Sequence, residues 1–170
     1  QMGLLMAILM GALNKALYPI LFKFLSNDMT KDSKNKLVKF SYLLFLGIAL
    51  MGVVLIVLLE LLYPYFLGNT FQDSLILTQL IVFGFMLEGF YYVVVNYIFY
   101  FKKTSSLAKI TFTVSLLHVA ISFLFVKLFG IVGAGYALVI SGVVQFILIW
   151  HLSNKIYPMP WFSFWRKNEI

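Results

Sequence analysis

The fold of this chain is decided by GFMLEGFYYVVVNYIFYFKKT, residues 84–104. From residue 84 to residue 101 every side chain is apolar, aromatic or that of glycine, except for a carboxylic acid at Glu88 and an amide at Asn96. Two lysines, Lys102 and Lys103, then end the run. A helix needs about 20 apolar residues to cross the ~30 Å hydrocarbon layer of a bilayer. The stretch therefore predicts a transmembrane helix that carries two polar groups and stops at a pair of positive charges.

The composition of the whole chain also indicates a membrane protein. Of its 170 residues, 62% are hydrophobic and 11% are charged, whereas soluble domains carry about 25% charged residues. Residues 40–59 and residues 128–154 contain no Asp, Glu, Lys or Arg. Lipid offers no partner to unpaired backbone groups, and these segments do not alternate in polarity as barrel strands do, so helices are expected. We predict an all-α integral membrane protein.

Five segments are long and apolar enough to span a bilayer. They form one membrane domain, residues 1–151, with spans at about residues 1–24, 38–63, 75–101, 108–128 and 131–151. The tight GIVGAG turn leaves almost no loop between the last two spans. Residues 152–170 combine tryptophan, phenylalanine and basic residues, which favour the headgroup region. We expect them to form an interfacial tail.

The basic residues are distributed unevenly between the two ends of the predicted spans. Five lie in the first connection, three in the third and three in the C-terminal tail, which makes eleven of the thirteen Lys and Arg residues. The other two are Lys127 and Lys15, and Lys15 lies inside the first span. Because basic residues stay on the cytoplasmic side, we expect these connections and the C-terminus to be cytoplasmic. Lys102 and Lys103 are then topology anchors.

Several polar side chains lie deep inside the predicted spans, where ionisable groups are costly and often functional. Glu88, Tyr92 and Asn96 follow one another on one helical stripe. Lys15 lies about 12 Å inside Lys23, at ~1.5 Å per residue. The candidates for a shared polar cavity are Lys15, Glu88, Tyr92, Asn96, His118 and Gln145. The alternative is that each side chain only hydrogen-bonds a neighbouring helix, because small and polar residues hold membrane helices together.

Enzymatic chemistry has little support in the sequence. The six acids, two histidines and one arginine are not clustered, so no catalytic residue and no metal site is predicted. The chain has neither cysteine nor a phosphate-binding glycine loop,. Its basic residues separate apolar runs instead of forming a soluble basic face, which argues against nucleic acid as a partner. We predict that the chain is not an enzyme and needs no cofactor.

Two stretches resemble a known family. Residues 96–161 contain YFKKT at the start of a span, then LFGIVGAGYALVIS and NKIYPMPW, and residues 12–26 read ALNKALYPILFKFLS with a proline inside a span. Together they resemble the C-terminal region of bacterial polysaccharide flippases, the Wzx-like members of the multidrug/oligosaccharidyl-lipid/polysaccharide exporter superfamily. Family members have twelve or more spans in two lobes around a central cavity, and the five spans here correspond to the last five. The chain departs from the family at His118, where asparagine is frequent, and at GAG, where GAA is common.

The resemblance implies translocation of undecaprenyl-diphosphate-linked oligosaccharide across the bacterial cytoplasmic membrane, for O-antigen, lipopolysaccharide or capsule biosynthesis. Two lobes would act by alternating access, so the implied partners are an N-terminal lobe of the same protein, membrane lipids and polysaccharide polymerase machinery. From charge and depth, and not from the family pattern, we expect Lys15 to meet a diphosphate or a sugar acid and Glu88 to couple the cycle to protons or sodium. The alternatives are a multidrug or cation exporter of the same superfamily and a non-transporting membrane subunit.

Overall fold

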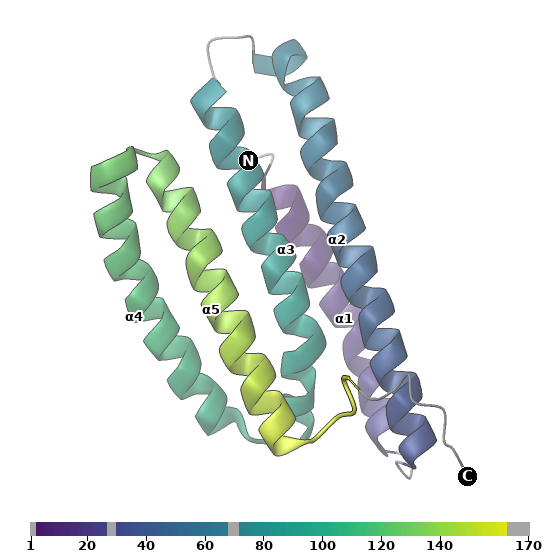
Figure 1. Ribbon diagram of the computed structural model, residues 1–170. Coiled ribbons are helices and arrows are strands. Elements are labelled where there is room, and N and C mark those ends of the chain that lie inside the picture. Colours follow the sequence, from purple (N-terminus) through teal and green to yellow (C-terminus); the bar gives the residue numbers. More distant parts are fainter. Residues whose placement is uncertain (1–2, 27–29, 68–71, 163–170) are drawn as a thin grey trace.

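The computed structural model describes residues 3–26, 30–67 and 72–162, and this part of the chain is a bundle of long helices. The helices are α1 (Leu4–Ser26), α2 (Lys31–Leu67), α3 (Gln72–Tyr100), α4 (Thr104–Phe129) and α5 (Val132–Ile156). All five are long and apolar enough to cross a membrane. They run side by side along one common direction (Figure 1). The predicted all-α class with five candidate spans is confirmed, and the chain is a multi-pass membrane protein.

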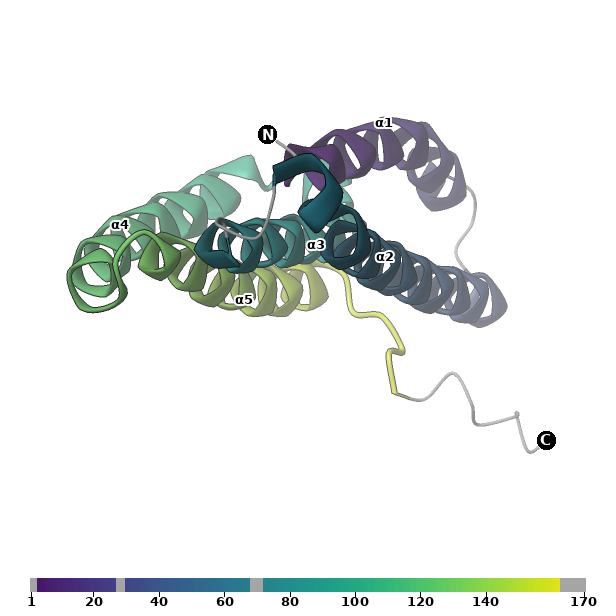
Figure 2. The ribbon, with the colours of Figure 1, turned by 90° about the horizontal axis from the view of Figure 1, so that it is seen from above.

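Helix α3 lies at the centre of the bundle. It packs against α1, α2 and α5, whereas α4 packs mainly against α5. Figure 2, seen from above, shows α1 and α2 on one side of α3 and the α4–α5 pair on the other. In the most apolar part of α3, 61% of the residues are buried within the bundle, against 6% in α4. Residues 84–101, at the centre of the bundle, therefore supply much of the core.

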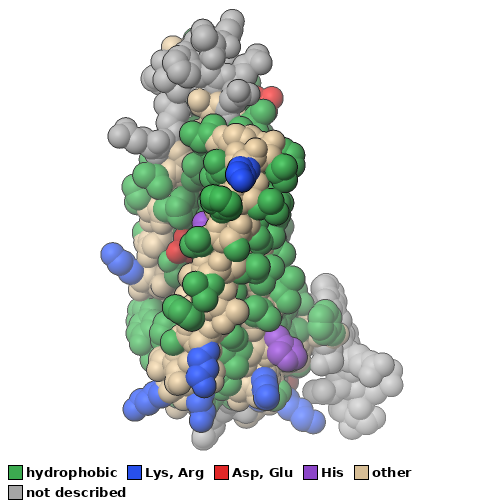
Figure 3. All heavy atoms as spheres, turned by 90° about the vertical axis from the view of Figure 1, so that its left-hand side faces the viewer, with side chains coloured by type: hydrophobic (Ala, Val, Ile, Leu, Met, Phe, Trp, Pro, Cys, Tyr) green, Lys and Arg blue, Asp and Glu red, His purple; other side chains and the backbone are tan. Residues whose placement is uncertain are grey.

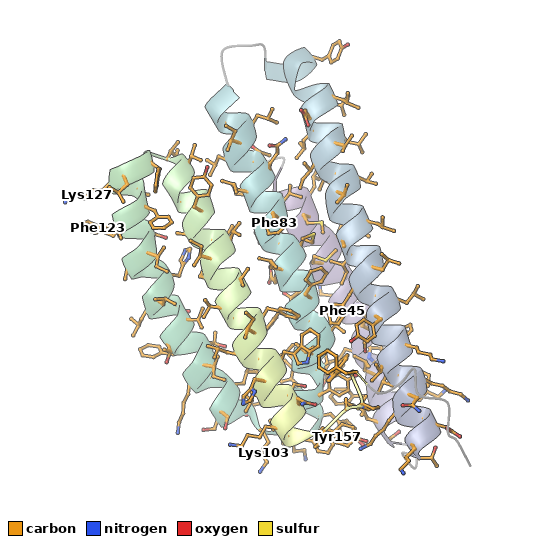
Figure 4. All side chains as sticks on the ribbon, in the orientation of Figure 1. Phe45, Phe83, Lys103, Phe123, Lys127 and Tyr157 are labelled. Atoms are coloured by element: carbon orange, nitrogen blue, oxygen red, sulfur yellow. The ribbon has the colours of Figure 1, made fainter. Side chains whose placement is uncertain are left out.

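The outer face of α4 consists of side chains that suit contact with lipid. Figure 4 shows Phe123 and Lys127 pointing away from the bundle near one end of α4. The Lys127 ammonium lies 5.4 Å from the centre of the Phe123 ring. The hydroxyls of Thr113 and Ser115 donate to carbonyls one turn earlier on the same helix, at 2.9 Å each. Because these hydroxyls are paired within α4, they need no partner in the hydrocarbon layer.

Glycines let α3 and α5 approach each other closely. A Cβ at Gly84 on α3 would lie 2.7 Å from the Cδ2 of Leu138 on α5. A Cβ at Gly135 on α5 would lie 2.8 Å from the Cδ1 of Leu80 on α3. Small residues at such positions are typical of helix contacts in membranes, where close packing drives association. The glycines therefore set the α3–α5 distance at which the polar side chains described below meet.

The α4–α5 turn is as tight as the GIVGAG sequence predicts. Gly130 has a φ of +62°, a left-handed conformation that glycine adopts without strain. The backbone N–H of Gly133 then donates to the Gly130 carbonyl at 3.0 Å. A Cβ at Gly133 would overlap the backbone carbonyl of Phe125 on α4. The turn therefore requires glycine at both positions.

Lys102 and Lys103 end α3 with a hydrogen-bonded turn. The backbone N–H of Lys102 donates to the Phe99 carbonyl at 3.0 Å, and that of Lys103 donates to the Ile98 carbonyl at 3.1 Å. These two bonds are those of a Schellman motif, in which the residue after the helix is left-handed. Lys102 takes that place with a φ of 56°. The two lysines therefore terminate the helix physically, in addition to their predicted role as topology anchors.

Helix α2 begins at Lys31, earlier than the predicted span at residue 38. The Thr30 side-chain oxygen accepts a hydrogen bond from the Ser33 backbone N–H at 3.2 Å, and Asp32 lies in the first turn. Both features stabilise a helix N-terminus. The lysine-rich segment therefore prolongs the helix beyond its apolar run.

Helix α5 also extends past the predicted span, to Ile156, and residues 157–161 then fold back as a short C-terminal strap. The Met159 backbone N–H donates to the side-chain oxygen of Asn154 at 3.1 Å. The Lys34 ammonium on α2 donates to the Pro158 carbonyl at 3.3 Å and lies 4.3 Å from the centre of the Tyr157 ring. These contacts of Lys34 connect the strap to the start of α2. At the same place, burial and, secondarily, the neighbouring Tyr100 raise the pKa of the Tyr157 phenol.

Trp161 anchors the end of the strap between α2 and α5. Its side chain is only 3% exposed, and its ring centre lies 6.1 Å from that of Tyr42, 6.5 Å from Phe45 and 5.1 Å from Trp150. The Tyr42 hydroxyl donates to the Trp161 carbonyl at 3.0 Å. The first part of the predicted interfacial tail thus packs onto the helices, and its residues 163–170 lie outside the described part of the chain.

The charges of the described residues are segregated along the bundle. Figure 3 shows most of the visible lysine side chains at the lower end of the molecule, with hydrophobic side chains over much of the face above it. This is the end at which α1 meets α2 and α3 meets α4 (Figure 1). The arrangement is the one that the positive-inside rule describes. That this end is cytoplasmic stays a prediction.

Candidate functional site

A cleft of about 160 Å³ opens between α3 and α5. Its walls come from both helices: Gly84, Phe85, Leu87, Glu88 and Tyr91 of α3, and Leu138, Ser141, Gly142 and Gln145 of α5. Two of these wall residues, Gly84 and Gly142, are glycines that let Leu138 and Leu87 from the facing helix pack closely against them. Glu88 lies about 18 Å from the C-terminal end of α3 and about 24 Å from its start, at ~1.5 Å per residue. The cleft is therefore near the middle of the central span.

Glu88 is half-buried, and one of its two carboxylate oxygens is occupied. The Tyr92 hydroxyl donates to Oε1 at 2.6 Å. The two residues are one turn apart on α3, so the helix itself brings them together. Within the described part of the chain, Oε2 makes no hydrogen bond. Glu88 thus offers the cleft one oxygen that can accept hydrogen bonds from water or from a ligand.

Ser141 and His118 form a hydrogen-bonded link between α5 and α4 beside the cleft. Nδ1 of His118 lies 2.9 Å from the Ser141 hydroxyl, which donates to the Ala137 carbonyl at 2.8 Å. Nε2 lies 3.4 Å from the Ser122 hydroxyl on α4. The Nδ1–H tautomer of His118 satisfies this set, because it donates to Ser141 and accepts from Ser122. His118 therefore supports the cleft wall without lining it.

A serine and a histidine at this distance could suggest a nucleophile and its base, but the geometry does not favour that chemistry. The Ser141 side chain is buried, and its hydroxyl already donates to a backbone carbonyl. Among the described residues, no group of three or more His, Cys, Asp or Glu side chains could hold a metal ion. The site is suited to non-covalent binding.

Gln145 lies in the cleft wall one turn after Ser141 on α5. Its carboxamide forms no hydrogen bond with any described residue. The amide therefore presents both a donor and an acceptor to the cleft. Gln145 and the free oxygen of Glu88 therefore present unused hydrogen-bonding groups from two different helices to the same space.

Asn96 faces α1 and not the cleft. Its side chain is 1% exposed, and Nδ2 donates to the Asn14 side-chain oxygen at 3.0 Å and to the Tyr92 carbonyl at 2.9 Å. Oδ1 is buried without a partner among the described residues. Each four-residue step along a helix of 3.6 residues per turn advances the direction by about 40°. Over the eight residues from Glu88 to Asn96 the stripe therefore turns by about 80°, from α5 towards α1.

Lys15 lies on the outer face of α1 and is exposed. Within the described part of the chain it forms neither an ion pair with Glu88 nor a hydrogen bond. The structure thus brings Glu88 and Gln145 together in one cleft, with Tyr92 and His118 attached to it through hydrogen bonds. Lys15 and Asn96 are outside its walls, and Lys102 and Lys103 lie in the α3–α4 turn.

Three residues of the site and its surroundings were not selected from the sequence. Ser141 precedes Gln145 by one helical turn, and this spacing could have identified it. Asn14 is a second amide inside an apolar span, which matches Asn96. Tyr91 had no such signal, because a tyrosine in a run of aromatic residues is indistinguishable from its neighbours.

No protein-family model, curated protein or solved structure matches the chain.

Proposed function

We propose that this chain is part of a flippase that moves undecaprenyl-diphosphate-linked oligosaccharide across the bacterial cytoplasmic membrane by alternating access. One observation carries the proposal: the half-buried Glu88 carboxylate faces a polar cleft near the middle of the central span. An ionisable group at that depth is costly, and such groups usually mark the path of a substrate or ion. The resemblance to polysaccharide flippases supplies the substrate class.

The alternative of a non-transporting subunit explains Asn96 better than it explains Glu88. Asn96 joins α3 to α1 through Asn14, as a residue that holds helices together should,. Glu88 instead bonds Tyr92 of its own helix, and within the described chain it links α3 to no other helix. A carboxylate that contributes no helix-to-helix bond needs another reason to lie inside a membrane bundle. Transport supplies that reason.

The remaining parts of the proposal rest on the family resemblance, except for the role of Lys15, which rests on its positive charge and its position on α1. The five helices would form most of the second lobe, and the first lobe of the same protein would complete a central cavity. Lys15, exposed on α1, would meet the diphosphate of the substrate. The basic end of the bundle and the C-terminus would be cytoplasmic, next to lipid headgroups and to the polymerase machinery.

An organic-cation exporter of the same superfamily is a second candidate, because the cleft combines Glu88 with the rings of Phe85 and Tyr91. A carboxylate beside aromatic rings suits a cationic ligand, since ring faces attract positive charge. The two candidates differ in what crosses the membrane and can be separated in one set of strains.

The test uses the full-length protein in bacteria that lack their own flippase. We expect Glu88→Gln to lower the amount of lipid-linked oligosaccharide in the outer leaflet by about tenfold or more, the effect of ~1.4 kcal/mol. Glu60→Gln is the matched control, because Glu60 is exposed on α2, and it should leave export unchanged at equal protein level. Equal export by both variants would contradict the proposal. Loss of ethidium efflux without loss of oligosaccharide export would favour the cation exporter.

A further inference from the structure

We propose that the α3–α5 cleft binds a single sugar unit of the transported headgroup, and that it accepts a neutral sugar or an amino sugar but not a sugar acid. The inference rests on the proposed flippase function and assigns a ligand to its cleft. It follows from the hydrogen-bonding groups, the aromatic rings, the size and the charge of the cleft.

The polar groups of the cleft match the edge of a sugar ring. Neighbouring sugar hydroxyls present donors and acceptors side by side. Glu88 offers Oε2 as an acceptor, and Gln145 offers both a donor and an acceptor from the opposite helix. A hydrogen bond to an ionised carboxylate is stronger than one between neutral groups. Two side chains on facing helices could therefore hold one ring between them.

The remaining wall suits the less polar face of such a ring. Phe85 and Tyr91 line the cleft from α3, and Leu138 lines it from α5. Binding sites for small molecules typically combine apolar and aromatic walls with a few placed polar groups. The volume of about 160 Å³ corresponds to about five water molecules at ~30 Å³ each. This space matches one sugar ring, with the rest of the headgroup outside the cleft.

The charge of the cleft selects among sugars. Its wall contains Glu88 but neither lysine nor arginine, and Lys15 lies outside it on α1. A sugar acid would place a second carboxylate next to Glu88, and two negative charges that share one small site repel each other. An amino sugar would instead bring a positive charge or an amide donor towards Oε2. The cleft therefore discriminates by sugar charge, while the diphosphate must bind elsewhere.

A small metal ion fits the same cleft less well. Hard cations take about six or more oxygen ligands. The cleft offers Oε2 of Glu88, the amide oxygen of Gln145 and the Tyr91 hydroxyl, whereas Oε1 and the Ser141 hydroxyl are engaged in other hydrogen bonds. The available groups are too few to surround an ion but suffice to orient a sugar ring.

The test measures binding of three defined lipids to the full-length protein in nanodiscs of phosphatidylethanolamine and phosphatidylglycerol. The probes are undecaprenyl diphosphate, the same lipid bearing N-acetylglucosamine and the same lipid bearing glucuronic acid. We expect wild type to bind the N-acetylglucosamine probe about tenfold more tightly than the sugarless lipid, as two or more hydrogen bonds would give. The glucuronic acid probe should bind no more tightly than the sugarless lipid.

Two variants connect these affinities to the cleft. Gln145→Leu should reduce the N-acetylglucosamine preference by about two- to tenfold, the usual effect of lost hydrogen bonds, while binding of the sugarless lipid is unchanged. Glu88→Gln should increase the affinity for the glucuronic acid probe, a gain that misfolding cannot produce. Gln79→Leu is the matched control, because Gln79 lies on α3 outside the cleft wall, and it should keep the wild-type preference.

The outcomes separate this inference from the proposed function. If wild type binds all three probes equally, the sugar site is overturned while the flippase proposal stands. If wild type binds none of them and exports no oligosaccharide, both proposals fail. A preference that survives both Gln145→Leu and Glu88→Gln, or a cleft that responds only to sodium, also overturns the sugar site.

Discussion

Asn96 on α3 donates a hydrogen bond to Asn14 on α1, with 3.0 Å between Nδ2 and Oδ1. The two amides are 82 positions apart in the sequence and meet inside a membrane bundle, where neither could hydrogen-bond to lipid. Asn96 Nδ2 also donates to the Tyr92 carbonyl at 2.9 Å. The pair is therefore a specific link between the N-terminal helix and the central helix.

We expect Asn14→Ala to destabilise the bundle by about 0.6 kcal/mol, the average for hydrogen bonds between membrane helices, whose maximum is about 1.7 kcal/mol. The cost should not approach that maximum, because Asn96 keeps the Tyr92 carbonyl as a partner. Reversible unfolding in mixed micelles of the two single variants and of Asn14→Ala/Asn96→Ala measures the coupling. The double variant should cost less than the sum of the single variants, and strictly additive costs would contradict the link.

Lys102 occupies a backbone conformation that costs energy for a residue with a Cβ. Its φ is 56°, whereas that of Lys103 is −89°. A left-handed residue other than glycine costs about 1–2 kcal/mol, so Lys102→Gly should stabilise the protein by up to about 1 kcal/mol in the same unfolding assay. Lys103→Gly removes the same charge without relieving strain, so it should not stabilise. Equal effects of the two variants would show that charge, and not backbone strain, dominates this turn.

The tight α4–α5 turn should be intolerant of even one methyl group. At Gly133 a Cβ would overlap the Phe125 backbone carbonyl, whereas at Gly47 on α2 no atom lies within 4 Å. Gly133→Ala should therefore destabilise the bundle by about 1–3 kcal/mol, as overpacking does. Gly47→Ala should be neutral or stabilising by up to ~1 kcal/mol, because alanine is the better helix former. The melting temperatures of the two variants provide the comparison, and a stable Gly133→Ala protein would contradict the predicted overlap.

The sequence predicts the helices well because lipid leaves the backbone few choices. The central span was expected at residues 75–101, and α3 runs from Gln72 to Tyr100. Termini set by local side chains were less predictable. Apolar character alone gave no indication that the Thr30 cap starts α2 at Lys31, seven residues before the expected span.

The direction in which a polar side chain faces was harder to predict than its depth. Four-residue spacing brings Glu88 and Tyr92 into contact, but the turn of about 40° per step adds up, and Asn96 faces another helix. The partners of a residue also depend on which helices are neighbours in space, and a sequence pattern does not contain this information. Trp161 shows this most clearly. It contacts Tyr42, which is 119 positions away in the sequence, whereas the composition of residues 152–170 indicates only a location near the lipid headgroups.

The C-terminal strap, residues 157–161, should contribute measurably to stability through Trp161. This side chain is 3% exposed, whereas that of the next residue, Phe162, is 91% exposed. Replacing a buried tryptophan by alanine typically costs about 3–5 kcal/mol, so Trp161→Ala should lower the unfolding midpoint strongly. Phe162→Ala should change the stability by less than about 0.5 kcal/mol. If both variants unfold like wild type, the strap is not held against α2 and α5 as described.

The orientation in the membrane can be tested with single cysteines, because this chain contains none of its own. Tyr65, near the end of α2, is 86% exposed, and Phe162, after the strap, is 91% exposed. The C-terminal end of α2 and the C-terminal end of α5, which the strap follows, lie at opposite ends of the bundle (Figure 1). If the lysine-rich end is cytoplasmic, a membrane-impermeant maleimide should label Tyr65→Cys in intact spheroplasts and Phe162→Cys only after the membrane is permeabilised. The full-length protein with every cysteine outside this chain replaced by serine provides the blank. The reverse labelling pattern would invert the topology and would place the C-terminus outside the cell.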